Sequence, residues 1–383
     1  MKVALVASSF LPQPGRLERR VDQIARGLAR RGVEVEILTQ GCGRAGFQQH
    51  QGVIVRRFPT AVGPLRFAVA PKLRERLRLT SETFDVVDVH TRHIPLAVAV
   101  ARTRARRIVF TPGAPLDVFL GWPYTRATRA VMAATAQIVC HSEIERDLLR
   151  ETVPEAASRT RIVPDAVDVA ALDAATPFVT AGTVVLAVDR LDRLTGVRRA
   201  IASMLSLDPE FRLVVVGDGP ARDRLEAYAA DLRIASRVQF VGAVSDAVLY
   251  RWLRTARVVV TLAAERGSGS QVTEARAAGA SVVASDLPIH REAAERPGGG
   301  HVIFVPAKGS PLDVADAIDE AARVSVLPST RGLSLAVPSW EPVIDATWRL
   351  YTQLTGVGLL PAPDPAVSDG AGIAAHRVNG WRT

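Results

Sequence analysis

Residues 213–220 read Leu-Val-Val-Val-Gly-Asp-Gly-Pro, an apolar run that stops at two glycines and a proline. Consecutive β-branched residues are typical of a strand that is buried on both faces of a parallel sheet. Glycines directly after such a strand let the backbone approach a ligand closely, as in dinucleotide-binding folds. Because Pro220 and the residues after it break the full G-x-G-x-x-G pattern, the stretch predicts a Rossmann-like sheet and gives poor support for a hydride-transfer cofactor.

Similar apolar runs recur on both sides of this stretch and alternate with helical patterns. In the second half of the chain we expect strands at 183–188, 212–216, 238–241, 258–262, 281–284 and 302–305. In the first half we expect them at 3–7, 33–37, 53–57, 85–89, 108–111, 138–141 and 161–163. Strands separated by helices indicate a parallel sheet that is covered on both faces.

The chain has 383 residues, which is too long for one ordinary core and suits two α/β domains. It becomes loop-like near 172–182, so we place one domain at 1–175 and a second at 176–335. The last segment, 359–383, is rich in proline, glycine and alanine and is expected to be a loosely ordered tail.

The composition, 48% hydrophobic and 23% charged, is that of an ordinary globular protein. The formal charge of +9 is carried almost wholly by arginine, and it favours anionic partners without choosing among nucleotides, acidic lipids and nucleic acid. No apolar run approaches the ~20 residues that span a bilayer, and the apolar N-terminus is too short for a signal peptide. We therefore expect a cytoplasmic protein. Cys42 and Cys140 lie far apart, which suggests idle thiols and no metal site.

Three loops follow strands of the second half, at the edge where doubly wound sheets bind ligands. The first contains Arg190, whose guanidinium suits a phosphate, although a solvated loop arginine explains Arg190 alone better. The second is 217–220. The third, 265–274, is a Gly/Ser loop that runs into a helix, where free N–H groups favour an anion. Glu274 lies in the first turns of that helix, where it either accepts the hydroxyls of a ribose or only stabilises the helix.

Taken together, these motifs resemble the retaining, family-four-type glycosyltransferases of GT-B fold (glycosyl transferases group 1). The resemblance rests on 213–220, 238–242 and 274–285, with support from 163–168 and 339–341. It implies an α/β GT-B architecture, in which two Rossmann-like domains face each other across a cleft. It also implies that the C-terminal helices within 336–358 return to the N-terminal, acceptor-side domain, and that the second domain binds the nucleotide sugar.

The resemblance further implies roles for individual residues. The arginine of the first loop would hold the donor diphosphate, the carboxylate closing the third loop would bind the donor ribose, and backbone N–H groups of the third loop would meet the distal phosphate and sugar. The predicted catalytic residues are Arg190, Arg193, Glu265 and His90. The predicted donor-binding residues are Gly15, Gly217, Gly242, Arg266, Gly267, Ser268, Gly269, Ser270 and Glu274.

The chain departs from the family pattern in its donor motif. The first of two glutamates expected in the third loop falls at Arg266, with Glu265 one step earlier, and the expected diphosphate lysine is Thr195. Either a one-residue shift of the loop brings Glu265 into place, or Arg193 and Arg266 supply the missing positive charge. At the domain junction, Asp165 stands where the family usually has asparagine.

We therefore expect an enzyme that moves a hexose-type sugar from a nucleotide-diphosphate sugar to a hydroxyl acceptor with retention, without a metal or other cofactor. Two classes of acceptor are possible: a natural product, such as an aminoglycoside, or a cell-envelope glycan or lipid. An acceptor of the second class would bring the protein into peripheral contact with the inner membrane face. The alternatives are an impaired relative that binds a nucleotide or a partner, a sugar-nucleotide epimerase, and an arginine-rich nucleic-acid binder. The last is disfavoured, because the arginines of 16–31 mostly lie opposite an apolar helix face, as a solvated face would, without interleaved aromatic residues.

Overall fold

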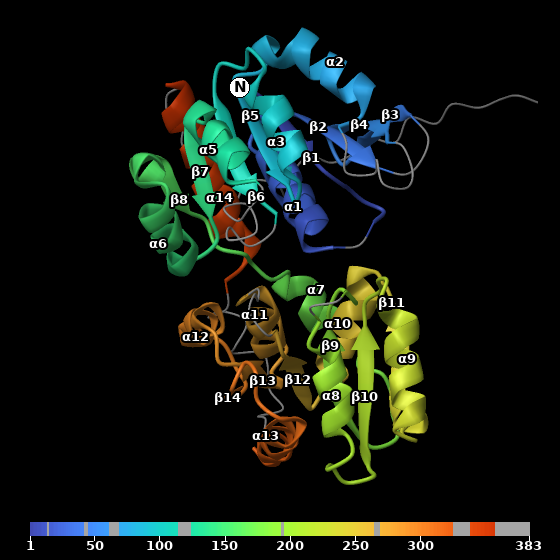
Figure 1. The fold of residues 1–383 in the computed structure, drawn as a ribbon. Coiled ribbons are helices and arrows are strands. Elements are labelled where there is room, and N and C mark those ends of the chain that lie inside the picture. The colour runs from blue at the N-terminus through green and yellow to red at the C-terminus, as the bar shows by residue number, and fades with distance from the viewer. Residues whose placement is uncertain are drawn as a thin grey trace, which may run out of the picture.

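The computed structural model describes residues 1–13, 15–41, 45–60, 69–113, 124–192, 195–263, 269–324 and 338–356. They form two α/β halves that stand one above the other, each with its own sheet (Figure 1). Within the described ranges, none of the helices has the length and apolarity needed to cross a bilayer.

The first half contains an eight-stranded sheet in the order β3-β4-β2-β1-β5-β6-β7-β8. Its strands are β1 (Lys2–Ala7), β2 (Glu34–Gly41), β3 (Gly46–His50), β4 (Val53–Pro59), β5 (Val86–Thr91), β6 (Ile108–Pro112), β7 (Gln137–Cys140) and β8 (Thr160–Ile162). Its helices are α1 (Arg16–Arg30), α2 (Pro71–Thr80), α3 (Ile94–Ala101), α5 (Thr125–Ala134) and α6 (Glu143–Thr152). All neighbouring strands are parallel except β3, which pairs antiparallel with β4 at the edge.

The second half contains a six-stranded, wholly parallel sheet in the order β11-β10-β9-β12-β13-β14. Its strands are β9 (Thr183–Val188), β10 (Phe211–Val216), β11 (Val238–Gly242), β12 (Val258–Thr261), β13 (Ser281–Ser285) and β14 (Val302–Val305). Its helices are α8 (Val197–Ser203), α9 (Arg222–Asp231), α10 (Asp246–Thr255), α11 (Gly269–Ala277), α12 (Pro288–Glu295) and α13 (Pro311–Arg323). The predicted α/β class with two parallel, Rossmann-like sheets is confirmed.

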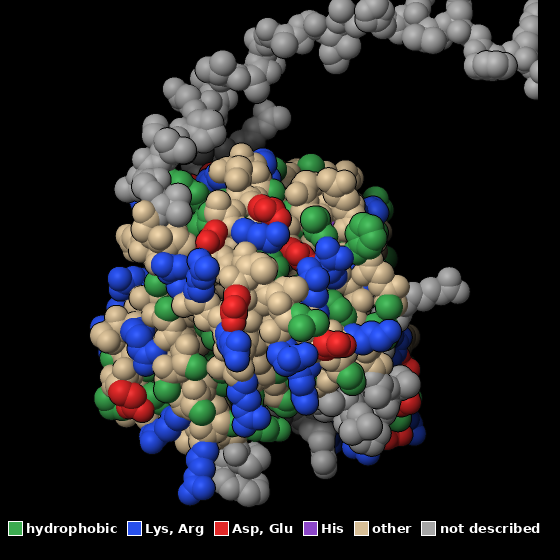
Figure 2. Space-filling view, turned by 90° about the horizontal axis from the view of Figure 1, so that it is seen from above, with side chains coloured by type: hydrophobic (Ala, Val, Ile, Leu, Met, Phe, Trp, Pro, Cys, Tyr) green, Lys and Arg blue, Asp and Glu red, His purple; other side chains and the backbone are tan. Residues whose placement is uncertain are grey.

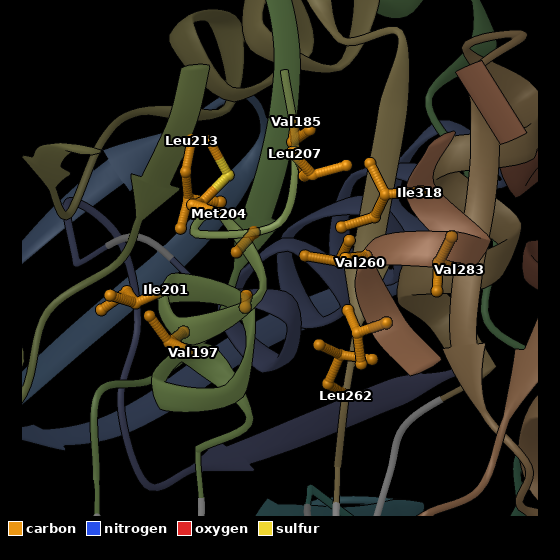
Figure 3. Close-up of a cluster of buried hydrophobic side chains, with 14 of the residues drawn as sticks. Val185, Val197, Ile201, Met204, Leu207, Leu213, Val260, Leu262, Val283 and Ile318 are labelled. Atoms are coloured by element: carbon orange, nitrogen blue, oxygen red, sulfur yellow. The ribbon is translucent and has the colours of Figure 1, made fainter. Parts of the chain in front are cut away.

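The valine-rich strands are buried because helices cover both faces of each sheet. Figure 3 shows one such layer in the second half, where α8 and α13 close over β9, β10, β12 and β13. Val185, Leu213, Val260 and Val283 rise from the strands, and Ile201 and Ile318 come from the helices. Each such side chain gains roughly 1.5–3 kcal/mol from leaving water. These layers make each sheet a rigid platform for the loops at its edge.

Two segments connect the halves. The short helix α7 (Val169–Ala174) lies between them, and the C-terminal helix α14 (Trp340–Thr355) returns to the first half beside α1 (Figure 1). Gly27 permits this packing, since a Cβ at its position would lie 2.5 Å from Ile344. The Tyr351 hydroxyl donates a 2.6 Å hydrogen bond to the buried Asp88 carboxylate and anchors the helix further.

Candidate functional site

The carboxyl ends of the strands of both sheets point toward the junction of the two halves. Because parallel strands end at one edge, the loops after β9, β10, β11 and β12 lie together there. A groove of about 730 Å³ opens at the junction among α1, α7 and α10. A smaller cavity of about 30 Å³ lies between Arg16, His141 and Asp165 on one side and Gly269 and Ser270 on the other. The ligand-binding edges of the two sheets therefore face each other.

The glycines after β10 allow loops of the protein itself to pack closely. A Cβ on Gly217, whose φ is +129°, would lie 1.8 Å from the carbonyl oxygen of Asp189, and one on Gly219 would lie 2.3 Å from that of Leu191. The Gly217 N–H donates to the Gly242 carbonyl at 2.8 Å. The space beside these glycines is thus filled by the backbone of 189–191. The sequence suggested instead that a ligand approaches the glycines. Their effect is to fix the loop that carries Arg190.

Arg190 lies at the end of β9 with an exposed side chain. The adjacent Asp189 is turned inward, where its carboxylate accepts a 2.7 Å hydrogen bond from the Thr195 hydroxyl. Burial raises the pKa of Asp189, and the Thr195 hydrogen bond opposes that rise. At the position where the family has a lysine, this chain therefore has a residue that braces the loop.

The first turn of α11 faces the first half of the molecule. Gly269 packs tightly on α12, since a Cβ there would lie 2.9 Å from the Ala293 Cβ. The Gln271 side chain accepts a hydrogen bond from the Thr261 hydroxyl at 2.7 Å and donates one to the Val188 carbonyl. This amide ties the ends of β9 and β12 to the helix. Arg193, Glu265, Arg266, Gly267 and Ser268, which the sequence assigns to the site, lie outside the described residues.

Glu274 on α11 contacts Arg19 of α1 across the junction. Arg19 Nη1 lies 3.2 Å from Glu274 Oε1, and the guanidinium also lies 3.5 Å from the Asp246 carboxylate and 3.0 Å from the Tyr250 hydroxyl. Both Arg19 and Glu274 are 9% exposed. Burial raises the pKa of Glu274, and the positive charge of Arg19 opposes this rise. The carboxylate predicted to bind a ribose is therefore held by a residue from the opposite half.

Two neighbouring arginines of α1 also turn toward the protein: Arg20 is buried and Arg16 is half-buried. The expectation that the arginines of this helix form a solvated face is therefore wrong at its first turns. Arg16 and Arg20 both contact the carboxylate of Asp165, and Arg20 also donates to the Val163 carbonyl at 3.1 Å. Burial alone would raise the pKa of Asp165, but Arg16, His141 and Arg20 hold it well below its usual range. Sequence reasoning missed this cluster because its acidic members come from segments far from α1 in the chain.

His90 and Gly15 lie in the first half. The sequence placed His90 after a strand, but β5 continues to Thr91, and the His90 side chain is 0% exposed with Nε2 3.2 Å from Asp88. Its burial leaves the side chain without a surface open to a substrate in this conformation, and the catalytic role of His90 stays a prediction. Gly15 immediately precedes α1, where a Cβ would lie 3.1 Å from the Arg92 guanidinium. Its assignment to the donor site stays a prediction.

A second bridge joins the halves on the other side of α11. The Glu292 carboxylate of α12 accepts hydrogen bonds from the backbone N–H groups of Glu143 at 2.9 Å and Ile144 at 3.1 Å. These N–H groups belong to the first turn of α6, where a negative charge is favourable. Arg296 donates to the His141 carbonyl beside them at 3.2 Å. The two bridges hold the halves together around the N-terminus of α11.

The chain matches two family models. Residues 17–171 match the family described as Glycosyltransferase Family 4, and residues 169–328 match the family described as Glycosyl transferases group 1.

Curated proteins similar to the chain include two from actinobacteria. The chain is 25% identical to the phosphatidyl-myo-inositol mannosyltransferase of Mycolicibacterium smegmatis, over 94% of this chain and 95% of that protein. It is 30% identical to the D-inositol 3-phosphate glycosyltransferase of Acidothermus cellulolyticus, over 74% of this chain and 75% of that protein. Among solved structures, the sucrose-phosphate synthase of Thermosynechococcus elongatus superposes with a TM-score of 0.73 at 20% identity, covering 93% of this chain and 100% of that chain.

Proposed function

We propose that the chain moves a hexose from a nucleoside diphosphate sugar to a hydroxyl of a lipid-linked or inositol-type acceptor, with retention. The chain belongs to the group 1 glycosyltransferases of GT-B fold, which transfer a sugar from a nucleotide sugar. The donor would lie at the strand ends of the second half, and the acceptor would enter from the first half.

The observation that carries the donor site is the placement of Glu274 and Arg190 at one sheet edge. Arg190 stands at the end of β9 with its guanidinium exposed, and α11 directs its N-terminus toward the same junction. A guanidinium and free helix N–H groups are the groups that bind phosphates in proteins. A carboxylate a few residues farther along the helix suits the two hydroxyls of a ribose. This set fits a nucleoside diphosphate.

In the proposed reaction the bond between the anomeric carbon and the diphosphate oxygen breaks, and its electron pair leaves with the diphosphate. A new bond forms between the anomeric carbon and the acceptor oxygen, whose proton passes to the leaving phosphate. The developing negative charge favours positioned cations and N–H groups over a strong base. Arg190 and the first turn of α11 are placed to stabilise it, and we propose the same role for Arg193 and for the amides of 267–268. Glu265 and Arg266 stay proposed contacts of the donor sugar.

The names of relatives support an acceptor that is attached to a lipid or built on inositol. One relative is a GDP-mannose:cellobiosyl-diphosphopolyprenol alpha-mannosyltransferase, 28% identical over 79% of this chain. Together with the mannosyltransferase named above, it favours a mannosyl donor and gives no support to an aminoglycoside acceptor.

Peripheral contact with an anionic membrane is part of the proposal. Figure 2 looks down on the end of the first half, where Lys and Arg side chains are spread over much of the surface. Exposed basic residues of the first half include Lys72, Arg74 and Arg78 on α2 and Arg102, Arg104 and Arg106 before β6. Co-sedimentation with vesicles of acidic lipid, but not of neutral lipid, and its loss at high salt would support this contact.

A second candidate is an impaired relative that binds a nucleotide without turnover. It is favoured by Thr195, which braces Asp189 where the family places a lysine. A panel of UDP-, GDP-, ADP- and dTDP-sugars, followed by thermal shift and by release of the nucleoside diphosphate, separates the two. Stabilisation with release supports the transferase, stabilisation without release supports the impaired relative, and no stabilisation by any donor contradicts both.

A further inference from the structure

We infer that Arg19 is a positioning residue for the donor ribose, which acts from the first half of the molecule by holding the Glu274 carboxylate of the second half. This inference rests on the proposed function, because that function assigns the ribose to Glu274. Neither the family pattern nor the sequence analysis gives Arg19 a role.

The contacts of Arg19 all cross the junction. The residue lies in the first turn of α1, yet its ion-pair and hydrogen-bond partners Asp246, Tyr250 and Glu274 belong to α10 and α11. Its guanidinium is almost completely buried among them. A side chain that has lost its rotational freedom holds its partners in a fixed geometry without a further ordering cost.

Arg19 uses only part of the hydrogen-bonding capacity of the Glu274 carboxylate. Arg19 contacts Oε1 at 3.2 Å, and among the described residues no other side chain forms an ion pair or hydrogen bond with this carboxylate. An ionised carboxylate has about four acceptor positions on its two oxygens. The acceptor positions that Arg19 leaves unused match the two hydroxyls of a ribose in number.

Arg19 also favours the ionised form of Glu274. Burial raises the pKa of this carboxyl, and Asp246 of α10 and Asp165 of the junction add to the rise. Arg19 and, more weakly, Arg16 of α1 act in the opposite direction. Without Arg19 the carboxyl would be protonated at a higher pH, and a protonated carboxyl accepts fewer hydrogen bonds.

Tyr250 fixes the guanidinium in turn. Its hydroxyl oxygen accepts a 3.0 Å hydrogen bond from Arg19 Nη1. Burial raises the pKa of Tyr250 to about 12, so the phenol stays neutral over the working pH range and does not compete with Glu274 for the positive charge. Since Arg19 and Glu274 lie in different halves, the ribose site is complete only when the two halves are together.

The test measures nucleoside diphosphate affinity as a function of pH, using the nucleotide that the donor panel identifies. The variants are Arg19→Gln, Arg19→Lys, Glu274→Gln and the double variant Arg19→Gln/Glu274→Gln. Arg31→Gln is the control, because Arg31 directly follows the C-terminus of the same helix and pairs with Glu341 and Asp345 of α14, away from the junction.

We expect Arg19→Gln to weaken binding roughly tenfold at neutral pH, the effect of one lost charge-assisted contact, and to move the acid limb of the affinity profile to higher pH. Arg19→Lys should restore part of the affinity, Arg31→Gln should have no effect, and the double variant should bind no more weakly than Glu274→Gln. Unchanged or tighter binding by Arg19→Gln, with Glu274→Gln impaired, would overturn the inference and leave the proposed function standing. If Glu274→Gln instead binds the nucleoside diphosphate as tightly as the wild-type protein, Glu274 does not bind the ribose.

Discussion

The guanidinium of Arg19 lies 3.2 Å from the carboxylate of Glu274, although the two residues belong to helices that cover different sheets. This contact sets the distance between the loops that end β9 and β12 and the first turn of α1. The Glu292 carboxylate of α12, which accepts hydrogen bonds from the first turn of α6, forms a second contact, and the two contacts enclose the N-terminus of α11 between the halves. The candidate site is therefore formed only when the two domains are closed, and its affinity for a ligand depends on the residues that hold them closed.

Asp165 is expected to stabilise the junction through its charge. Replacing it by asparagine, the residue usual in the family, leaves Arg16 and Arg20 without a counter-charge and should cost about 3–5 kcal/mol, as for other broken buried ion pairs. Because the native pKa of Asp165 is lowered, its contribution is fully present above about pH 4 and is lost as the pH falls through the native value. Urea unfolding of both proteins between pH 3 and pH 7 measures this difference. An unfolding free-energy gap that does not shrink toward low pH contradicts the assignment.

Glu292 is expected to hold the two halves together by capping α6 from the other half. The change Glu292→Ala leaves the Glu143 and Ile144 N–H groups without their acceptor, at a cost of about 1 kcal/mol for a lost helix cap. Small-angle X-ray scattering should show a larger radius of gyration for this variant. Glu295→Ala, on the exposed side of the same helix, is the control, and an equal expansion in both variants would argue against the bridge.

Much of this architecture follows from the sequence, because apolar runs identify buried parallel strands wherever they occur. The strands at Thr183–Val188 and Val302–Val305 have the predicted bounds. The edge strand Gly46–His50 was missed, since its residues are mostly polar and exposed and its pairing is antiparallel. The arginines of α1 were misjudged for a different reason. Local periodicity shows which side of a helix is polar, but not that a second domain covers it.

The loop glycines and His90 show the same limit at the level of the site. Sequence spacing located the loop of Gly217. Only the tertiary structure reveals that the backbone at Asp189 packs against this glycine. His90 lies one residue from the end of β5, and its face of the sheet is buried by α14 from the far end of the chain. Which strand ends stay open is therefore decided by long-range packing.

Gly27 is expected to be essential for docking α14. A Cβ in Gly27→Ala would lie 2.5 Å from Ile344 and force the helices apart, at a cost of about 1–3 kcal/mol for overpacking. Thermal unfolding measures this loss. Gly46→Ala is the control because no atom lies within 4 Å of the added carbon. Gly27→Ala should cost less stability in an Ile344→Ala background, which lacks the side-chain atoms that the new carbon meets. An equal cost in both backgrounds would mean that the two residues are not in contact.

Thr195 is expected to brace the Arg190 loop through its hydroxyl. The change Thr195→Val removes the 2.7 Å hydrogen bond to the Asp189 carboxylate and should cost about 1 kcal/mol of stability. Thr195→Ser keeps the hydroxyl and should retain most of it. Hydrogen exchange of the amides at 189–192 provides the local measurement, and equal protection in the valine and serine variants would show that the hydroxyl does not support the loop.

We propose that Glu274 belongs to a nucleotide-sugar site between the two halves. The most direct test is calorimetric titration of wild-type protein and Glu274→Gln with the nucleoside diphosphate of the preferred donor, with melting temperatures measured in parallel. We expect a folded variant whose affinity is lower by roughly tenfold or more, as for the loss of a charged acceptor. Equal affinities in two equally stable proteins would contradict it.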